Sequence, residues 1–430
     1  MTDVTTPAAR PLRGWKALDL DTRLLGMIGA FIVIAIAFDI ASGGRFITPR
    51  NLFNLTIQTA SVAIMATGMV FIIVTRHIDL SVGSILATTS AVMAMTQTSL
   101  MPDVLGLGLG HPLTAWVAIL FGIITSAASG AFHGYLVGYL AIPAFIVTLG
   151  GLLVWRNVAW YLTSGQTIGP LDETFQLFGG INGTLGVTGS WILGLAASAA
   201  TLWALLAARR NKISHEFPVK PMWAEITVAA IAIGAILGFV ALLNAYSVPS
   251  RVLQRDFAAR DEVMPEGFTQ GYGVPISIVL LITVAIVMTV IARRTRFGRY
   301  IFATGGNPDA AELSGINTRM LTVKIFALMG VLCAISAVVA SARLANHSND
   351  IGILDELRVI AAAVIGGTAL KGGIGTIHGA IIGALIMQSL QSGMAMVGVD
   401  APLQNIVVGG VLVLAVWIDI VYRKRTGAKD

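Results

Sequence analysis

The sequence has few charged residues and a single cysteine. Charged side chains make up 12% of the 430 residues, whereas hydrophobic residues make up 56% and the mean hydropathy is +0.82. A typical soluble domain has about 25% charged residues, so this composition excludes a soluble globular protein and indicates a membrane protein. Because Cys333 is the only cysteine, the chain can form neither an intrachain disulfide nor a thiol metal cluster.

Motifs that carry enzyme chemistry are also absent. There is no G-x-x-x-x-G-K-[ST] phosphate loop, since the glycine-rich stretch Gly366–Lys371 has a different spacing. There is no G-x-S-x-G or H-E-x-x-H motif and no His/Cys/Glu spacing that suits a metal. We therefore expect no catalytic residue, metal or cofactor in this chain. The formal net charge of +6 does not indicate a nucleic acid partner, because the basic residues lie at the ends of apolar runs.

Apolar stretches recur along the whole chain. A transmembrane helix needs about 20 residues, and ten stretches are long enough while two are short. We predict an all-α polytopic membrane protein with about 12 transmembrane segments. The ten are Leu24–Ala41, Leu52–Val74, Thr114–Leu140, Ala144–Leu162, Trp191–Ala208, Met222–Leu243, Pro275–Ala292, Met320–Ser341, Ile374–Met396 and Leu403–Tyr422, and the two short ones are Leu80–Met95 and Leu357–Leu370.

Basic residues predict the orientation of these segments. Met1–Arg23 is polar and lacks a cleavable signal, so we expect a cytoplasmic N-terminal tail. Alternation from that start places Arg209–Lys212, Arg293–Arg299, Lys371 and the C-terminal tail 423–430 on the cytoplasmic face, as the positive-inside rule requires. The transmembrane domain then covers 24–422, with a cytoplasmic loop at 293–319 and an outer loop at 246–273.

The loop 293–319 contains a short helix with clear ends. Asn307 is a good N-cap, Pro308 fits the first helical position, Asp309 suits the positive end of the helix dipole and Gly315 is a left-handed stop. We predict a helix over Pro308–Ser314 that is about 10 Å long, too short to span a membrane. Its small residues suit docking against a partner. The alternative is a capped surface helix with no partner.

Each short apolar segment adjoins a polar hinge that contains glycine. The hinges are Arg76–Ser84 and Gly366–Thr376. Broken helices in corresponding positions of two halves point to a transport pathway, and we predict a parallel repeat with both hinges toward the cytoplasm. Asp79 is either a helix N-cap or a functional acid within the membrane.

Further polar residues interrupt the apolar helices. Asn157 lies among Trp155, Arg156 and Trp160, and aromatic rings beside amides suit a sugar, although boundary aromatics usually anchor a helix at the membrane interface. Glycines spaced by four residues, at 130, 134 and 138 and at 375, 379 and 383, predict close helix packing. We expect the neighbouring His133 and His378 to be hydrogen-bonded to a helix. The pathway candidates are Asp79, Ser81, Gly83, Asn157, Gly373, Gly375 and Gln388.

Two segments resemble a known family. Gly305–Ile316 resembles the GGN-x-x-AA-x-x-SGI stretch of permease subunits from sugar ABC importers of the ribose, arabinose and xylose group, and Ile78–Ser84 resembles their IDLSVGS signature. The resemblance extends from Asn51 to Arg423. The Arg76-His77 pair before the signature and the added helices at Trp191–Leu243 are similar to xylose-type members.

The resemblance implies a multi-pass permease of the bacterial inner membrane that imports a monosaccharide, D-xylose or a related pentose. It further implies a homodimer, a separate ATPase subunit that binds ATP, and a periplasmic or lipoprotein sugar-binding protein, in addition to membrane lipid. The segment that seats in the ATPase would comprise Asn307, Asp309, Ala310, Ala311, Glu312, Ser314, Gly315 and Ile316. Relatives usually carry a basic residue in place of Glu312.

Two other functions and one local alternative stay open. A gradient-driven sugar transporter should carry acids in the middle of helices, whereas Asp39, Asp79 and Asp419 lie near predicted helix ends. A membrane-embedded transferase would need a polar catalytic cluster, which the sequence lacks. In the outer loop, Arg251–Val263 can form an amphipathic helix that either docks the binding protein or lies on the bilayer.

Overall fold

The computed structural model describes residues 22–217, 219–259 and 261–425, and the predictions for 1–21 and 426–430 lie outside this part. Every regular element in the described residues is a helix, and nine of these helices are long and apolar enough to cross a membrane. The predicted all-α, multi-pass fold is thereby confirmed. The predicted domain contains two compact units, a smaller one with Leu185–Val274 and a larger one with 27–184 and 275–430.

The smaller unit is a helical hairpin followed by a loop. Its two long helices, α7 and α8, are joined near an ion pair between Arg209 and Glu225 at 2.5 Å, and Gly194 packs against Val240. Both helices expose most of their apolar side chains, as expected of helices that contact lipid. The elements of this unit are α7 (Gly186–Ser214), α8 (Met222–Asn244) and α9 (Ser250–Ala258).

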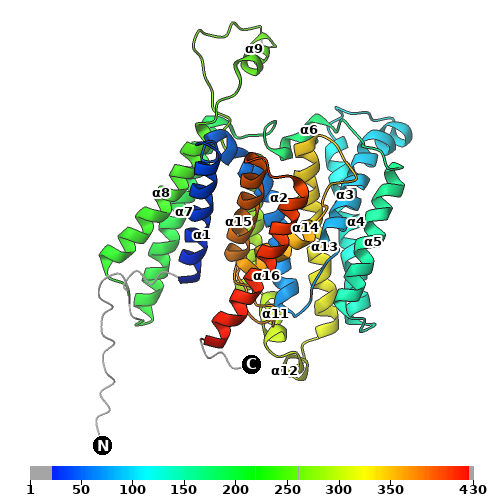
Figure 1. The fold of residues 1–430 in the computed structure, drawn as a ribbon, viewed down its shortest axis with the longest axis vertical. Coiled ribbons are helices and arrows are strands. Elements are labelled where there is room, and N and C mark those ends of the chain that lie inside the picture. The colour runs from blue at the N-terminus through cyan, green and yellow to red at the C-terminus, as the bar shows by residue number, and fades with distance from the viewer. Residues whose placement is uncertain (1–21, 218, 260, 426–430) are drawn as a thin grey trace, which may run out of the picture. The chain divides into compact units, whose positions relative to one another are not determined.

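Helix α9 lies in the predicted outer loop, at the end where α7 begins and α8 ends (Figure 1). It is shorter than the predicted amphipathic helix Arg251–Val263, because the chain turns through a positive φ of 56° at Asp261. Leu253 is buried, and the Phe257 and Phe268 rings meet edge to face with centroids 5.4 Å apart. The apolar side of α9 therefore packs against its own loop.

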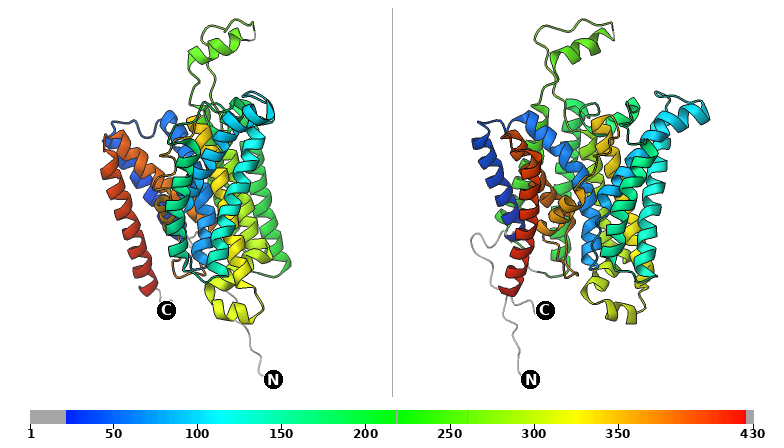
Figure 2. Two further views of the ribbon diagram at one scale, coloured as in Figure 1. Left: turned by 90° about the vertical axis from the view of Figure 1, so that its right-hand side faces the viewer. Right: turned by 45° about the vertical axis from the view of Figure 1, so that its right-hand side comes forward.

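The larger unit is a bundle around α2 and α13, which are the two most buried long helices. In Figure 1, α12 lies at one end of this unit and α6 at the other, and both views of Figure 2 place α11 and α12 at the end toward which α16 runs. The elements are α1 (Thr22–Ala41, from Met27 on), α2 (Pro49–Val74), α3 (Val82–Met95), the π-helix η2 (Thr96–Val104), α4 (Thr114–Gly138), α5 (Ala144–Thr163), α6 (Glu173–Gln176), the 3₁₀-helix η3 (Leu177–Gly179), α10 (Ile276–Arg294), α11 (Arg296–Gly306), α12 (Pro308–Leu313), α13 (Thr318–Leu344), α14 (Asp355–Ile365), α15 (Ile377–Met396) and α16 (Ala401–Arg425).

Helix α4 packs along α13 through a stripe of small residues. A Cβ atom added at Gly130 would lie 2.2 Å from the Phe326 carbonyl oxygen, and one at Gly138 would lie 2.6 Å from the Arg319 carbonyl oxygen. Only glycine allows two helix backbones to approach this closely. The predicted packing role of the glycine stripe is therefore confirmed, and because the contacts run in opposite residue order, the two helices are antiparallel.

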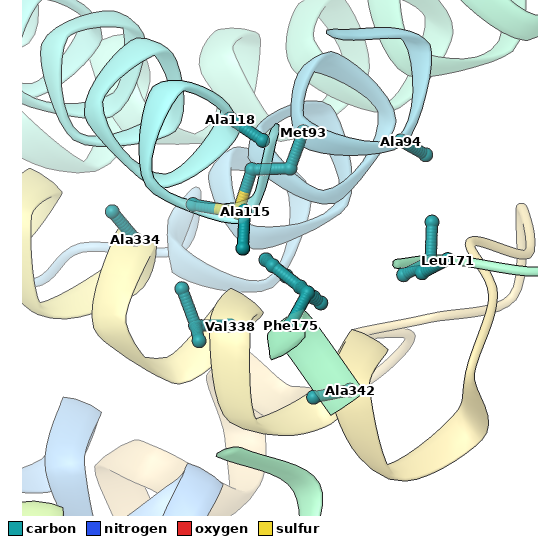
Figure 3. Close-up of a cluster of buried hydrophobic side chains, with 9 residues drawn as sticks. All are labelled: Met93, Ala94, Ala115, Ala118, Leu171, Phe175, Ala334, Val338 and Ala342. Atoms are coloured by element: carbon teal, nitrogen blue, oxygen red, sulfur yellow. The ribbon is translucent and has the colours of Figure 1, made fainter. Parts of the chain in front are cut away.

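An apolar cluster closes the bundle at the end near α6. Phe175 of α6 inserts between α4 and α13, and Figure 3 shows it beside Met93, Val338 and Ala342. Small residues on α4 and α13 leave room for the phenyl ring. The cluster consists of Met93, Ala94, Ala115, Ala118, Leu171, Phe175, Ala334, Val338 and Ala342.

The short-segment predictions had different outcomes. Helix α14 is indeed short, with 11 residues. The prediction that Leu80–Met95 is a short segment was wrong, because η2 continues the helix to Val104. Polar residues and Pro102 in η2 lower the local hydropathy, so the apolar pattern of the sequence did not indicate that the helix continues.

The two hinges of the predicted parallel repeat, Arg76–Ser84 and Gly366–Thr376, lie at the same end of the larger unit, because the Gly373 amide donates to the Val74 carbonyl oxygen and Gly372 packs against Arg76. Ser61 Oγ lies 2.7 Å from Ser336 Oγ, and Gly68 packs against Leu332, so α2 and α13 run in opposite directions. Each is followed by a non-helical segment, Thr75–Ser81 after α2 and Ala345–Leu354 after α13, and then by another helix. Ala345–Leu354 is therefore a further non-helical segment, between α13 and α14.

The two non-helical segments meet where α3 and α14 begin. His347 Nδ1 lies 2.8 Å from Ser90 Oγ, two turns into α3, and the chain then descends until Gly352 contacts Gly83. A Cβ at Gly83 would lie 2.2 Å from the Gly352 carbonyl oxygen and 2.6 Å from Glu356 Oε2. Two helix N-termini therefore face each other deep in the larger unit.

Candidate functional site

The segment that resembles an ATPase dock forms the predicted helix. Asn307 Oδ1 accepts a hydrogen bond of 3.0 Å from the Ala310 amide, which caps the first turn of α12. Ser314 is the C-cap and Gly315 has a φ of 84°, a conformation that favours glycine. The predicted end at Ser314 differs from the observed end, Leu313, by one residue.

The exposed side of α12 is a potential docking surface. Leu313 is 90% exposed and Ala310 is exposed, whereas Ala311 is buried against the rest of the unit. Asn307, Asp309, Glu312, Ser314 and Gly315 are also exposed, and Ile316 is half-buried. An open hollow of about 330 Å³ lies beside α12, lined by Glu312, Gly315, Ile316, Asn317, Thr318 and Arg319.

Gly373 and Gly375 lie behind this docking surface. The Gly373 amide donates to the Val74 carbonyl oxygen at 2.9 Å, and a Cβ at Gly375 would lie 2.8 Å from Val70 Cγ1. Both glycines therefore let the turn between α14 and α15 pack against the end of α2. They do not line the large cavity described below.

Asp79 is the acceptor at the end of a chain of hydrogen bonds. Its Oδ1 accepts from the Ser81 amide at 2.9 Å and from the Ser81 hydroxyl at 2.6 Å. Trp155 Nε1 donates to His133 Nε2 at 2.9 Å, so the neutral His133 ring carries its proton on Nδ1, which lies 3.2 Å from Ser81 Oγ. The direction is Trp155 to His133 to Ser81 to Asp79, and it links α5, α4 and the start of α3. The prediction that His133 is hydrogen-bonded is confirmed.

This network is closed, and neither Asp79 nor Ser81 lines one of the main cavities found in the described residues. Both side chains are almost completely buried, at 1% and 0% exposure. Asp79 uses its carboxylate to hold Ser81, the residue at the N-cap position of α3, through its amide and its hydroxyl. Asp79 is therefore not itself the helix N-cap that the sequence left as an alternative to a pathway role. Gly83 contacts Gly352 and likewise serves a close backbone approach.

The principal cavity of the larger unit lies between α2, α13, α14, α15 and α16. Its volume of about 550 Å³ falls within the range of about 300–1,000 Å³ typical of small-molecule sites. We call it the chamber. Its apolar lining comes from residues such as Ile57, Val339 and Ile351. Its polar lining residues are Gln58, Ser61, Arg343, Ser348, Asp350, Asp355, Arg358, Gln388, Gln391, Gln404 and Asn405.

The charges in the chamber balance, with two acids and two arginines. Arg358 Nη1 donates to Asp355 Oδ1 at 2.9 Å, while the buried Nε atom of Arg358 has no hydrogen-bond partner among the described residues. The Gln388 amide donates from α15 to Gln58 Oε1 of α2 at 2.8 Å. The chamber therefore offers amide, hydroxyl and guanidinium groups without net charge, which suits an uncharged ligand rich in hydroxyl groups.

A smaller hollow of about 200 Å³ continues the chamber toward η3. It shares Ile57, Gln58 and Arg343 with the chamber and adds Asn54 and Asn182, among others. Asn54, Gln58 and Ser61 lie at i, i+4 and i+7 on α2, so they form a polar stripe on one helix face. This spacing within an apolar helix was the sequence signal for the chamber wall, and the sequence analysis missed it.

The predicted pathway residues therefore do not all lie in one site. Gln388 lines the chamber, and Gln391 lies one turn further along α15. Asn157 is exposed on α5, where its amide donates to the Leu153 carbonyl oxygen, and it does not line the chamber. Trp160 and Tyr161 are also exposed, and no aromatic side chain lines the chamber among the described residues. A search of the described residues finds no group of three His, Cys, Asp or Glu side chains that could hold a metal.

Comparisons with known proteins agree with this architecture. The family model described as "Branched-chain amino acid transport system / permease component" matches residues 51–416. The xylose transport system permease protein of Haemophilus influenzae is 35% identical over 96% of this chain and 100% of its own length. The corresponding protein of Escherichia coli K12 is 35% identical over 98% of each chain, and its ribose import permease protein is 32% identical over 91% of this chain and 92% of its own.

No solved structure matches the chain. The family match covers most of the chain and, with the helices described above, indicates a multi-pass membrane protein and a transport component. This chain therefore belongs to the family of permease components described for branched-chain amino acid transport systems.

Proposed function

We propose that this chain is the membrane-spanning subunit of an ABC importer that carries a monosaccharide, D-xylose or a related pentose, across the bacterial inner membrane. In this proposal it acts as a homodimer, receives the sugar from a binding protein and is driven by ATP hydrolysis on a separate subunit. Similarity to xylose permeases over 96–98% of the chain supports the substrate class.

The observation that carries the proposal is the composition of the chamber. A sugar offers several hydroxyl groups and no charge, and the chamber provides five amide side chains beside a balanced set of charges. The amides are Gln58, Gln388, Gln391, Gln404 and Asn405. Hydrogen bonds in such a site replace those that the sugar makes with water. The absence of aromatic lining among the described residues favours weak contacts, which suit passage better than retention.

Uptake by reconstituted vesicles tests the substrate. The permease is assembled with its ATPase subunit and binding protein, and uptake of labelled D-xylose is measured with and without ATP inside the vesicles. We expect ATP-dependent uptake that unlabelled xylose competes for and leucine does not. Uptake that leucine abolishes and xylose leaves unchanged would assign the chain to amino acids instead.

The exposed side of α12 supports contact with the ATPase. Ala310 is exposed and Ala311 is buried, so Ala310→Trp adds bulk to the surface without disturbing the interior. We expect this variant to lose ATP-driven uptake and to stay in the membrane. Ala207→Trp, at an exposed position of α7, is the matched control and should leave uptake unchanged. Wild-type uptake by the Ala310 variant would remove α12 from the docking surface.

The loop around α9 supports contact with the binding protein. Its apolar residues Leu253 and Phe257 pack within the loop, while Arg251 and Arg255 are exposed. Charged contacts of this kind weaken with salt, because the screening length falls to about 8 Å at 0.15 M. Reversal of both arginines to Glu should lower stimulation of ATP hydrolysis by the binding protein and preserve the basal rate. Equal stimulation at low and high salt would favour a loop that lies on the bilayer.

A further inference from the structure

Arg76 joins the end of α2 to the end of α11. Its backbone φ is 65°, in the left-handed region, and its side chain reaches across to the α11 C-terminus. Nε donates to the Gly305 carbonyl oxygen at 3.0 Å and Nη2 donates to the Gly306 carbonyl oxygen at 2.8 Å. These are the last two carbonyl groups of α11, where the negative end of the helix dipole favours a cation.

A third segment packs into the same place. The turn between α14 and α15 bonds to α2 through the Gly373 amide and the Val74 carbonyl oxygen. A Cβ at Gly372 would lie 2.6 Å from Arg76 Cγ, and a Cβ at Gly305 would lie 2.0 Å from the Val74 carbonyl oxygen. Three backbones therefore meet around one guanidinium group, and we call this contact the junction.

The junction lies between the docking surface and the residues that line the chamber. Gly306 is followed by Asn307, the N-cap of α12, so a shift of α12 acts directly on the two carbonyl groups that Arg76 holds. On the far side, Arg76 leads through Thr75–Ser81 to the N-terminus of α3, and the turn at Gly373 leads to α15, which carries Gln388.

We propose that Arg76 is a positioning residue that transmits movement of α12 to α3 and α15, so that ATPase closure changes the chamber. This inference rests on the proposed function, since it needs an ATPase that binds α12. Specifically, the two hydrogen bonds from the Arg76 guanidinium group to α11 couple docking of the ATPase to transport.

The backbone conformation of Arg76 allows an experiment that distinguishes a role in coupling from a role in stability. A non-glycine residue at positive φ is strained, and glycine adopts this conformation without a steric cost. Arg76→Gly therefore removes the two hydrogen bonds while relieving backbone strain, so the two effects on stability oppose each other. A purely structural role predicts a change in unfolding temperature in proportion to any loss of transport, whereas a coupling role predicts loss of transport alone.

The experiment compares Arg76→Gly, Arg76→Lys and Arg299→Ala in the complete complex in vesicles. We measure xylose uptake, basal ATP hydrolysis, ATP hydrolysis stimulated by the sugar-loaded binding protein, and unfolding temperature. Arg76→Gly should lower uptake per ATP hydrolysed by about tenfold, within the usual range of coupling energies, at an unchanged basal hydrolysis rate and unfolding temperature. Arg76→Lys keeps the charge but has no fork of donors, so its uptake should be intermediate. Arg299, an exposed cation of the same helix α11, should be dispensable.

The outcomes are distinct. Wild-type uptake per ATP in Arg76→Gly overturns the inference, as does an equal loss in Arg299→Ala. If Arg76→Gly does not accumulate, Arg76→Lys decides: reduced coupling with normal unfolding supports the inference, and normal coupling overturns it. A wild-type complex that takes up no sugar overturns the proposed function instead, and stimulation of ATP hydrolysis by whichever ligand the complex accepts then still measures the coupling at Arg76.

Discussion

The Asp79 network and the chamber are both polar regions inside an apolar bundle, and they use their hydrogen bonds differently. Around Asp79, each donor is matched to an acceptor of the protein, from Trp155 through His133 and Ser81. In the chamber, Gln58 and Gln388 bond to each other across an open volume, and Arg358 Nε has no hydrogen-bond partner among the described residues. The hydrogen bonds of the first region stabilise the fold, whereas the polar groups of the chamber remain accessible to a ligand.

The difference shows why an acid inside a membrane helix bundle is not by itself evidence of a transport pathway. Asp79 belongs to the part of the sequence with the strongest family signature, yet its carboxylate accepts hydrogen bonds from Ser81 at the start of α3. The amides of the chamber have no motif of their own in the sequence. Substitutions in the two regions should therefore change different measurements, stability in one and transport in the other.

The largest effect is expected for Asp79→Ala. The substitution leaves the buried Ser81 amide and hydroxyl without their acceptor, and each such loss costs about 1–3 kcal/mol. We expect a loss of about 2–6 kcal/mol in the free energy of unfolding, seen as a lower unfolding temperature and lower yield. Asp79→Asn keeps one acceptor oxygen and should lose less. Normal stability with reduced transport would instead place Asp79 in the pathway.

The next effect concerns His347, a buried residue between the two regions that bonds to Ser90 while its Nε2 atom has no partner. Burial and the neighbouring Arg156 lower the pKa of His347 to about 4 from 6.5. Between these values the unfolded chain binds more protons, so stability is full above pH 6.5 and is lost as the pH falls toward 4. At pH 5 the loss is about 2 kcal/mol.

Unfolding temperatures from pH 8 to pH 5 test this expectation. His347→Asn should flatten the decrease between pH 6.5 and pH 5, at some cost in stability at pH 8. The exposed His215 provides the matched control, and His215→Asn should leave the profile unchanged. An unaltered profile in the His347 variant would show that another group causes the acid sensitivity.

A smaller effect is expected for Gln388→Leu in the chamber. The side chain faces an open volume, and water can satisfy the freed Gln58 oxygen, so we expect little change in unfolding temperature. Loss of a hydrogen bond to the sugar is worth about 0.5–1.5 kcal/mol, which lowers uptake by about three- to tenfold. A drop in stability without a change in uptake would show that Gln388, like Asp79, stabilises the fold and does not contact the sugar.

The smallest effect is expected for Asn157→Leu. The amide is exposed and bonds within its own helix to Leu153, so the variant should match the wild type in uptake and stability. It serves as the control for Gln388→Leu, because both replace an amide in a long helix by the same apolar side chain. A clear loss of uptake would show that Asn157 contributes to transport, although it does not line the chamber.

The sequence determined the features that depend on local chemistry. Apolar runs of about 20 residues predicted the membrane helices because the bilayer fixes their length. The caps at Asn307 and Gly315 predicted α12 to within one residue, because capping involves only neighbours in the chain. Glycines four residues apart predicted the contact of α4 with α13, because such spacing places them on one helix face.

Tertiary structure decided how distant segments meet. Nothing local to Asp79 distinguishes a cap from a pathway acid, since the answer depends on His133 and Trp155 from other helices. The junction at Arg76 joins residues more than 200 positions apart, and the chamber collects amides from α2, α15 and α16. Helix faces can be inferred from spacing, but which face meets which neighbour depends on the packing of the whole bundle. That packing decided which polar residues are buried in the fold and which line the chamber.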